Sequence, residues 1–499
     1  METGHKYLSA TPPIQNSESE NTQKVLRIKK NLQINNNQRS LRILHIGNIA
    51  NNAYLAARSE REVGLESHVI SNDYTHIMGS PEWEHCKVSR EESDHFSEDF
   101  SDCTCEFVRP AWFHSGSMAT AALSLQNAIS AESTSEIVGN PIGFNSPARK
   151  IREGLSRAVS VLWQVCRPIG RKVVPIKYRA SLIGFLIHRL RKATQLDMTT
   201  IFDQFDVVNL YGSSPHLIAN LNLSSQSRNK FTATEHGTLR DYIFAKYPLS
   251  KDTKSGYERS KVIFVTNQDC LPIAEAMKTP KVIRMPHPIN DELLFNYRNM
   301  RKTNLSKPLF NVIVPSRHSY SLDIDRGKGN EKVYEVIKTM ANLELPIQFT
   351  LIAWGDNVKG ARQLLKSEED QGVVKWINVL SRPLLKELMA ESLCLLDQFK
   401  IEAYGAVTVD GIGVGLPVIT AHSCENDKAY FGSCAPVLPA KTAPEIQEHI
   451  LLLYNASIKD RVKAFDESCD WYDNNLSEQI SLSRRLEGYL LTFKENWER

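Results

Sequence analysis

The stretch that decides the fold is LCLLDQFKIEAYGAVTVDGIGVGLPVIT, residues 393–420. Residues 393–396 form a short apolar run that ends at Asp397, which predicts a buried parallel strand. A polar turn follows, then a helical pattern over about 404–414, and residues 416–420 predict the next strand. A strand–helix–strand unit places the turn after its first strand at the carboxyl edge of the sheet, where open α/β sheets bind ligands.

The turn between these expected elements carries chemistry suited to a sugar nucleotide. Amides that open a helix have a partial positive charge, which suits phosphate. Two carboxylates flank the turn, Glu402 and, after seven intervening residues, Asp410. Ionised carboxylates accept hydrogen bonds from hydroxyl groups. Together these features predict a ligand that has both phosphates and hydroxyls.

The same residues resemble the donor signature of retaining glycosyltransferases of the GT-B type, in particular glycosyltransferase family 4. That signature is Glu, seven residues, Glu, a small-residue run and Gly-x-Pro-Val-Ile. Here it reads Glu402, Tyr404-Gly405, Asp410 and Gly415-Leu416-Pro417-Val418-Ile419. The resemblance implies donor contacts from Glu402, Tyr404, Gly405 and Asp410, with a reach to the ribose that is one methylene shorter because Asp410 replaces Glu.

Length and composition are those of a globular protein with two cores. The chain has 499 residues, 41% hydrophobic and 23% charged, with a formal net charge of +3 that does not point to nucleic acid. Only Cys103 and Cys105 lie close together among nine cysteines, which favours a reduced, cytoplasmic chain over a zinc site. We find no apolar run of membrane-span length and no signal-peptide core, so we expect a cytoplasmic protein that at most touches a membrane.

Repeated strand–edge–helix units predict an α/β protein with two Rossmann-like doubly wound domains facing across a cleft. The expected division is a disordered tail (1–40), an acceptor-side domain (41–300) with an irregular and basic insertion (85–200), a donor domain (301–475) and a helix that crosses back (476–499). In the first domain, Gly47 and Asn51 follow the first strand. They fit a loop against the donor diphosphate, or a turn whose asparagines cap the next helix.

Residues 149–192 combine twelve basic residues with a single acid, Glu153, and with interleaved apolar clusters. This pattern is typical of a helix that lies on an anionic membrane surface. A helical pair that covers the sheet while its arginines are solvated explains the pattern equally simply. Both interpretations stay open, and the absence of a recognised binding module argues against nucleic acid.

Catalytic residues follow from the resemblance. It implies that Arg317 and Lys328 contact the diphosphate and that His236 lies beside the donor sugar, with Glu402 near the anomeric centre. A fixed Arg and Lys offset the charge of a leaving diphosphate without a bound metal, so we expect no metal and no cofactor. The eleven-residue separation of Arg317 and Lys328 exceeds the family's usual gap, and it leaves Arg326 as a rival. Asp323 and Asp325 have the spacing of a metal-binding motif, but they lie among the extra residues between Arg317 and Lys328.

The sequence therefore predicts a retaining, hexosyltransferase-type glycosyltransferase acting on a glycan or lipid-linked glycan in cell-surface polysaccharide or glycolipid synthesis. Two alternatives remain at this stage. A GT-B epimerase would convert the sugar nucleotide without an acceptor, and a non-catalytic protein would bind it without turnover.

Overall fold

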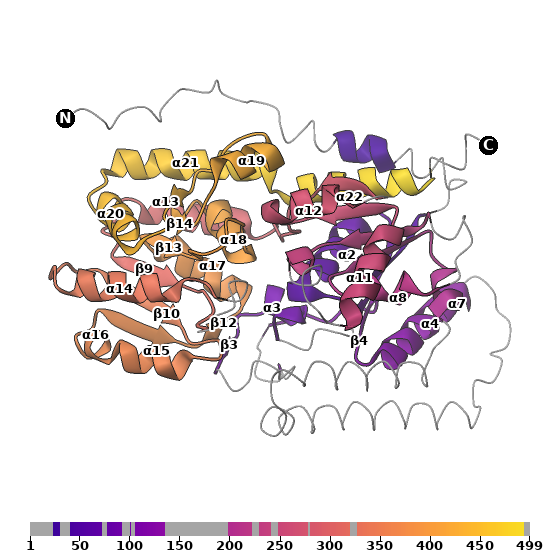
Figure 1. Ribbon diagram of the computed structural model, residues 1–499, viewed down its shortest axis with the longest axis horizontal. Helices are drawn as coiled ribbons and strands as arrows, with labels where there is room; N and C mark the ends of the chain where they lie inside the picture. Colours follow the sequence, from indigo (N-terminus) through magenta and orange to yellow (C-terminus); the bar gives the residue numbers. More distant parts are fainter. Residues whose placement is uncertain are drawn as a thin grey trace.

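The structure is a computed structural model of the 499-residue chain. It describes residues 23–29, 40–71, 77–91, 100, 105–134, 198–221, 229–240, 248–277, 280–319 and 327–493. These form two α/β domains that lie side by side, the first in indigo to magenta and the second in orange and yellow (Figure 1).

The first domain is built on a parallel seven-stranded sheet in the order β4-β2-β1-β5-β6-β7-β8. Its interior strands are buried on both faces, as the apolar runs predicted. The strands are β1 (Arg42–Ile46), β2 (Glu66–Ser71), β4 (Phe113–Ser115), β5 (Val207–Tyr211), β6 (Phe231–Thr234), β7 (Val262–Val265) and β8 (Lys281–Arg284). The helices are η1 (Ile49–Asn51), α2 (Asn52–Glu62), η2 (Ile77–Gly79), α3 (Glu82–His85), α4 (Met118–Thr134), α7 (Met198–Phe202), α8 (His216–Ala219), α11 (Pro248–Arg259), η4 (Gln268–Cys270) and α12 (Leu271–Glu275).

The second domain repeats the plan with a parallel six-stranded sheet in the order β11-β10-β9-β13-β14-β15. The strands are β9 (Asn311–Val314), β10 (Gln348–Ile352), β11 (Val374–Ile377), β13 (Cys394–Leu396), β14 (Val418–Thr420) and β15 (Leu438–Pro439). The helices are α13 (Leu294–Asn304), α14 (Asn330–Ala341), α15 (Val358–Leu364), α16 (Lys366–Asp370), α17 (Arg382–Glu391), α18 (Ala406–Val414), α19 (Cys424–Phe431), α20 (Ala443–Tyr454), α21 (Ile458–Asn475) and α22 (Glu478–Phe493).

The deciding stretch folds as β13, α18 and β14, which confirms the expected strand–helix–strand unit. The helix begins at Ala406, two residues later than predicted, because Gly405 is still extended at φ −77° and ψ 166°. It ends at Gly415, whose φ of 79° is the left-handed conformation that glycine adopts most readily.

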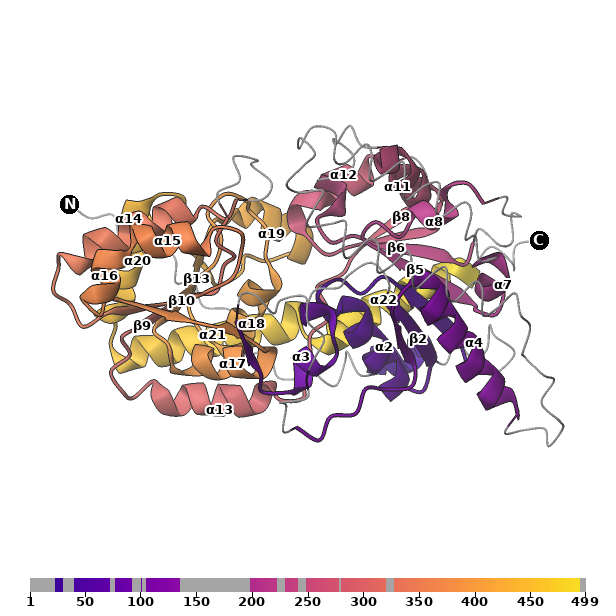
Figure 2. The ribbon, with the colours of Figure 1, turned by 90° about the horizontal axis from the view of Figure 1, so that it is seen from below.

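Short strands and one long helix join the two domains. Strand β3 (Ser89–Arg90) of the first domain pairs antiparallel with β12 (Val379–Leu380) of the second, at the junction seen in Figure 1. After α21, helix α22 crosses back to the first domain, where Leu482, Leu486 and Tyr489 pack against its sheet. Figures 1 and 2 show α22, in yellow, extending from the second domain across to the first. No helix in the described part of the chain is long and apolar enough to span a bilayer.

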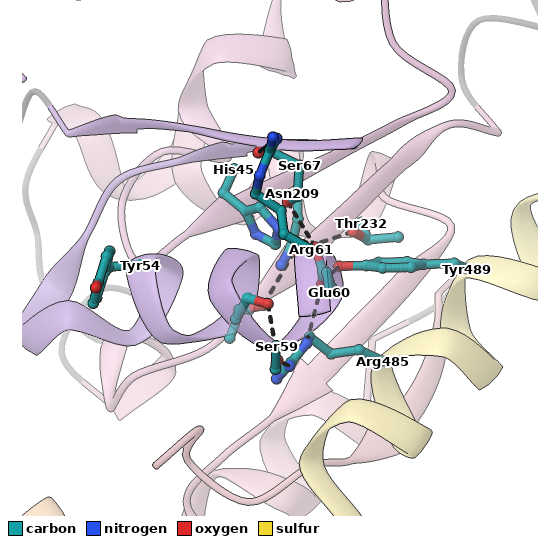
Figure 3. Close-up of polar contacts among 12 residues, drawn as sticks. His45, Tyr54, Ser59, Glu60, Arg61, Ser67, Asn209, Thr232, Arg485 and Tyr489 are labelled. Atoms are coloured by element: carbon teal, nitrogen blue, oxygen red, sulfur yellow. Dashed lines mark hydrogen bonds and ion pairs between the residues drawn. The ribbon is translucent and has the colours of Figure 1, made fainter. Parts of the chain in front are cut away.

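A buried polar network holds α22 in place (Figure 3). The Glu60 carboxylate on α2 has no exposed surface, and it accepts from Arg485 Nε at 3.2 Å and from the Tyr489 hydroxyl at 2.9 Å. Its other oxygen contacts His45 Nε2 at 2.8 Å and accepts from Ser67 at 2.7 Å. A buried charge is tolerated only when it is paired and fully hydrogen-bonded, so this network fixes the position of the helix.

Three expectations need correction. The expectation of an irregular insertion is wrong for residues 105–134. There β4 adds a strand to the sheet, and α4 packs on the sheet through Ala121, Ala122, Leu125 and Ile129. These residues recur at helical spacing, but two of the four are alanines, which give a weak apolar signal. The expectation of a disordered tail is wrong for residues 23–29. They form a helix, and its Val25 and Ile28 belong to the same buried cluster as the apolar residues of α22. The expected domain boundary at residue 300 also moves. Helix α13 begins at Leu294, within the range expected for the first domain, but it packs on α17 and α18 of the second.

The expectation of unpaired cysteines is also wrong for four of them. Cys86 pairs with Cys105, and Cys424 pairs with Cys434, with Cα separations of 5.5 and 5.0 Å. Among the described residues, Cys270, Cys394 and Cys469 are buried and free. The partners are 19 and 10 residues apart, so only the folded chain brings them together.

Replacing Arg485 by Met should lower the free energy of unfolding by about 3 to 5 kcal/mol, because Glu60 would stay buried without its cation. Urea denaturation measures the change. Arg484→Met on the same helix is the matched control, because Arg484 is exposed, and it should change little. The double variant Glu60→Gln/Arg485→Met should be more stable than Arg485→Met alone. Equal stability of Arg485→Met and Arg484→Met would contradict the role of the network.

Candidate active site

Gln398, directly after β13, connects Lys328 to the turn that carries Glu402. Lys328 Nζ donates to Gln398 Oε1 at 2.6 Å, and the Gln398 amide donates to the carbonyl of Ala403. The Phe399 amide also bonds to the Lys328 carbonyl at 2.8 Å. The structure therefore brings Lys328 and the 402–404 turn together, although 73 residues lie between Lys328 and Glu402 in the sequence.

Lys328 reaches this position because Gly329 precedes helix α14. Gly329 has a φ of 77°, and a Cβ atom there would lie 2.9 Å from the Cβ of Phe399. Only glycine combines that backbone conformation with so close an approach. The glycine that follows Lys328 therefore has a structural reason.

Positive charges from both domains act on Lys328. Burial lowers the pKa of Lys328, and the positive charges of Arg317 and Arg240 lower it further, while Asp397 raises it. Arg317 follows β9 in the second domain, whereas Arg240 comes from the first domain and forms a two-contact ion pair with Asp269. We did not identify Arg240 from the sequence. Its signal was its place three residues after Gly237 at a strand edge.

His236 lies in a stack of three rings at the carboxyl edge of the first sheet. Its ring stacks on Tyr211 with centroids 5.6 Å apart and on His287 at 5.4 Å. Burial and the neighbouring His287 hold the pKa of His236 well below its usual value, so the ring is neutral at pH 7. Its Nε2 atom is buried and has no hydrogen-bond partner in the described part of the chain.

Glu235 fixes the turn that follows His236. Its carboxyl group is fully buried, accepts from the amide of Gly237 and contacts Asn267 Nδ2 at 3.3 Å. Burial raises the pKa of Glu235. Gly237 has a φ of 80°, which closes the tight turn after His236.

The signature residues around α18 differ in how accessible they are. Glu402 is partly exposed and forms an ion pair with Lys441, with Asn426 Nδ2 3.5 Å from its other oxygen. The Tyr404 hydroxyl is buried and donates to Asp427 at 2.7 Å. Gly405 leaves room at the helix start, where a Cβ atom would lie 3.4 Å from Asp397 Oδ2. Of these three, only Glu402 has a side chain open to solvent.

Asp410 is held between cations, away from solvent. Its side chain has no exposed surface, contacts the Arg382 guanidinium, and lies 3.6 Å from Lys386 Nζ on the same helix, α17. Arg382 in turn lies 3.6 Å from Glu84 on α3 of the first domain. Asp410 therefore belongs to an interdomain ion network, and its expected contact with a ribose stays a prediction.

Gly47 and Asn51 have structural partners of their own. A Cβ atom at Gly47, where φ is 88°, would lie 2.8 Å from Ser214 Oγ, so glycine lets the ends of β1 and β5 approach. The Asn51 side chain does not cap α2, because its Oδ1 accepts from Asn48 Nδ2 at 3.0 Å, while its amide donates to the carbonyl of Ser80 at 2.7 Å. Asn48 accepts from the Tyr54 amide at 3.0 Å instead. The rival Arg326, the Asp323/Asp325 pair and the basic segment 149–192 lie outside the described residues.

Acid should destabilise the protein between pH 6.5 and 4 through its buried histidines. Burial lowers the pKa of His287 from 6.5 to about 4, helped by Arg382 and Arg240. In this window the unfolded chain binds a proton that the folded chain does not, so stability falls as the pH falls, by up to about 3 kcal/mol for one such group. His287→Gln should flatten the fall of melting temperature with pH, measured by calorimetry. An unchanged pH profile would contradict this reasoning.

No protein-family model matches the chain, and no curated protein matches it in sequence. Solved structures share its fold. The N-terminal domain of trehalose-6-phosphate phosphatase from Candida albicans is 10% identical, with a TM-score of 0.54 over 91% of this chain and 99% of that one. Sucrose-phosphate synthase from Thermosynechococcus elongatus is 11% identical, with a TM-score of 0.50 over 88% and 96%. At such identities the likeness shows the fold alone, and it confirms the expected GT-B arrangement of two parallel-sheet domains.

Proposed function

We propose that this protein is a retaining glycosyltransferase that moves a sugar from a nucleotide-sugar donor to a glycan or lipid-linked glycan. One observation carries the proposal. Lys328 and Arg317 of the second domain and Arg240 of the first are close enough for the two arginines to lower the pKa of Lys328. Cations gathered at facing carboxyl edges favour an anionic ligand between them, and a diphosphate is such a ligand.

The three cations fit the chemistry of a departing diphosphate. Transfer breaks the bond between the anomeric carbon and the phosphate oxygen, so negative charge grows on the leaving group. Fixed cations in a water-poor site offset that charge without having to reorganise. We therefore propose that donor cleavage needs neither metal nor cofactor, and that the leaving phosphate takes the acceptor proton on the face from which it departs, which retains configuration.

Two residues on opposite sides of the junction fit the donor sugar. The buried Nε2 atom of His236 has no partner among the described residues, and a sugar hydroxyl would satisfy it. Glu402 is partly exposed, and its partner Lys441 is itself largely exposed, so a hydroxyl can replace that lysine at low cost. We assign His236 and Glu402 to the sugar. Gly47, Asn51, Tyr404 and Gly405 shape the donor site, and Asp410 becomes accessible to the ribose only if Arg382 moves away.

The family-4 resemblance of residues 402–419 supports an acceptor in cell-surface polysaccharide or glycolipid synthesis. We propose a cytoplasmic protein whose segment 149–192 lies on an anionic membrane surface when the acceptor is lipid-linked. Twelve cations with interleaved apolar clusters in that segment support this placement.

Lys328→Ala should lower the turnover of the accepted sugar nucleotide by about 100- to 1,000-fold, because one fixed charge on the leaving group is lost. A thermal-shift screen of UDP- and GDP-sugars first identifies the donor. Lys338→Ala, on the exposed face of α14, the helix that follows Lys328, is the matched control and should leave turnover unchanged. Wild-type turnover in a folded Lys328→Ala variant would refute the site. Donor conversion without an acceptor would favour an epimerase.

Co-sedimentation with vesicles that contain an anionic phospholipid should be strong at low salt and should weaken as salt rises, because screening shortens the reach of the charges. Vesicles of zwitterionic lipid alone are the control. Replacing Arg189, Arg191 and Lys192 by Gln should reduce binding to the anionic vesicles. Binding that depends on neither lipid charge nor salt would contradict the membrane interpretation and support the alternative, in which the segment covers the sheet.

A further inference from the structure

Four potential metal ligands lie on helix α19 or directly beside it, in the segment between β14 and β15. Among the residues that the structure describes, His422, Asp427 and Cys434 form the one group of this kind, with donor atoms within 4.8 Å of one another. Cys424 is not in this group, but its sulfur is bonded to that of Cys434, so reduction of the disulfide would free a second thiol next to the group. One imidazole, one carboxylate and two thiols form a donor set that suits Zn²⁺.

Hydrogen bonds orient the His422 ring for metal binding. The Tyr404 hydroxyl donates to Asp427 Oδ2 at 2.7 Å, so it must accept from His422 Nδ1, which lies 2.8 Å away. The proton is therefore on Nδ1, and the lone pair on Nε2 points toward Cys434 Sγ at 3.3 Å. Histidines that bind metals are fixed in this way by a partner on the second nitrogen.

The spacing also suits a tetrahedral ion. Zinc bonds of about 2.0 Å to nitrogen and 2.3 Å to sulfur put neighbouring ligand atoms roughly 3.3 to 3.8 Å apart. The separation of His422 Nε2 and Cys434 Sγ, 3.3 Å, falls in this range. His422 and Asp427 are buried and Cys434 is half-buried, so an ion here would be largely shielded from water.

We propose that this loop binds one structural zinc ion through His422, Cys424, Asp427 and Cys434 when the Cys424–Cys434 disulfide is reduced. Two molecules of a thiol reductant convert the disulfide to two Cys thiols and are themselves joined as a disulfide. Zinc then displaces the two thiol protons, which leave to solvent. The loop thus has two alternative closures, a disulfide and a metal.

The ion would fix the part of the loop that faces the proposed donor site. Asn426 lies between two of the ligands and contacts Glu402 at 3.5 Å. Gln268 of the first domain contacts Asp427 at 3.5 Å and accepts from the Tyr404 amide at 3.3 Å. Helices α19 and α12 lie close together at this junction in both views (Figures 1 and 2). The proposed zinc is structural and takes no part in sugar transfer, so it stands or falls separately from the proposed function.

The test uses the full chain, reduced with a phosphine, stripped with a chelator and mixed with Zn²⁺ alone. We expect one zinc per chain after gel filtration, and a thiolate-to-metal absorption band when Co²⁺ replaces Zn²⁺. Zinc should protect Cys424 and Cys434 from alkylation in a peptide map, while the alkylation of Cys394 and Cys469 serves as an internal control. Chain without retained zinc, or alkylation of Cys424 and Cys434 that zinc does not change, would overturn the proposal and leave the disulfide as the only closure.

Variants separate the ligands from the loop's general stability. His422→Gln and Cys434→Ser should abolish zinc retention, and Tyr404→Phe should weaken zinc affinity about 10- to 100-fold through loss of the partner on Nδ1. His449→Gln, on α20 of the same domain, should retain zinc like the wild type. Circular dichroism checks that each variant is folded. If a variant does not fold, the alkylation map of the wild-type chain tests the proposal without it. Full zinc retention by folded Cys434→Ser would refute the assignment.

Discussion

A buried charge must be paired, and this protein meets that constraint at two of the places where its two domains meet. Glu60 binds Arg485 where helix α22 returns to the first domain. Arg382 lies between Glu84 of the first domain and Asp410 of the second. Because none of these charges can move into solvent without leaving its partner unpaired, the two networks fix how the sheets face each other.

That fixed orientation is what gathers the candidate site. Each sheet alone offers a partial set at its carboxyl edge: His236 and Arg240 on the first, Arg317, Lys328 and Glu402 on the second. Gln398 holds Lys328 beside the 402–404 turn within the second domain, and Gln268 of the first domain accepts from the Tyr404 amide across the interface. The proposed diphosphate site is therefore a product of the interface, and neither domain contains it alone.

At the same interface, the motif residue Asp410 has partners that the sequence motif does not indicate. Asp410 occupies the position of the second acid in the signature, where the resemblance implies a ribose contact. In the folded chain its carboxylate is buried against Arg382 and Lys386. The shorter side chain of Asp keeps the carboxylate close to its own helix, within reach of cations on α17. Spacing along the sequence could not reveal this, because the partners come from residues 382 and 386.

The sequence by itself determined the strand–helix–strand units, since apolar runs, periodicity and glycines at strand ends act over a few residues. Lys328, Arg317, His236 and Glu402 were singled out by the resemblance to glycosyltransferase family 4, and each lies in a segment that follows a strand. Only the tertiary structure decided which distant segments meet: Gln268 of the first domain with the Tyr404 amide of the second, Cys424 with Cys434, and the small-residue helix α4 with β2. Such contacts depend on distant segments closing on one another, and that information is not present in any local pattern.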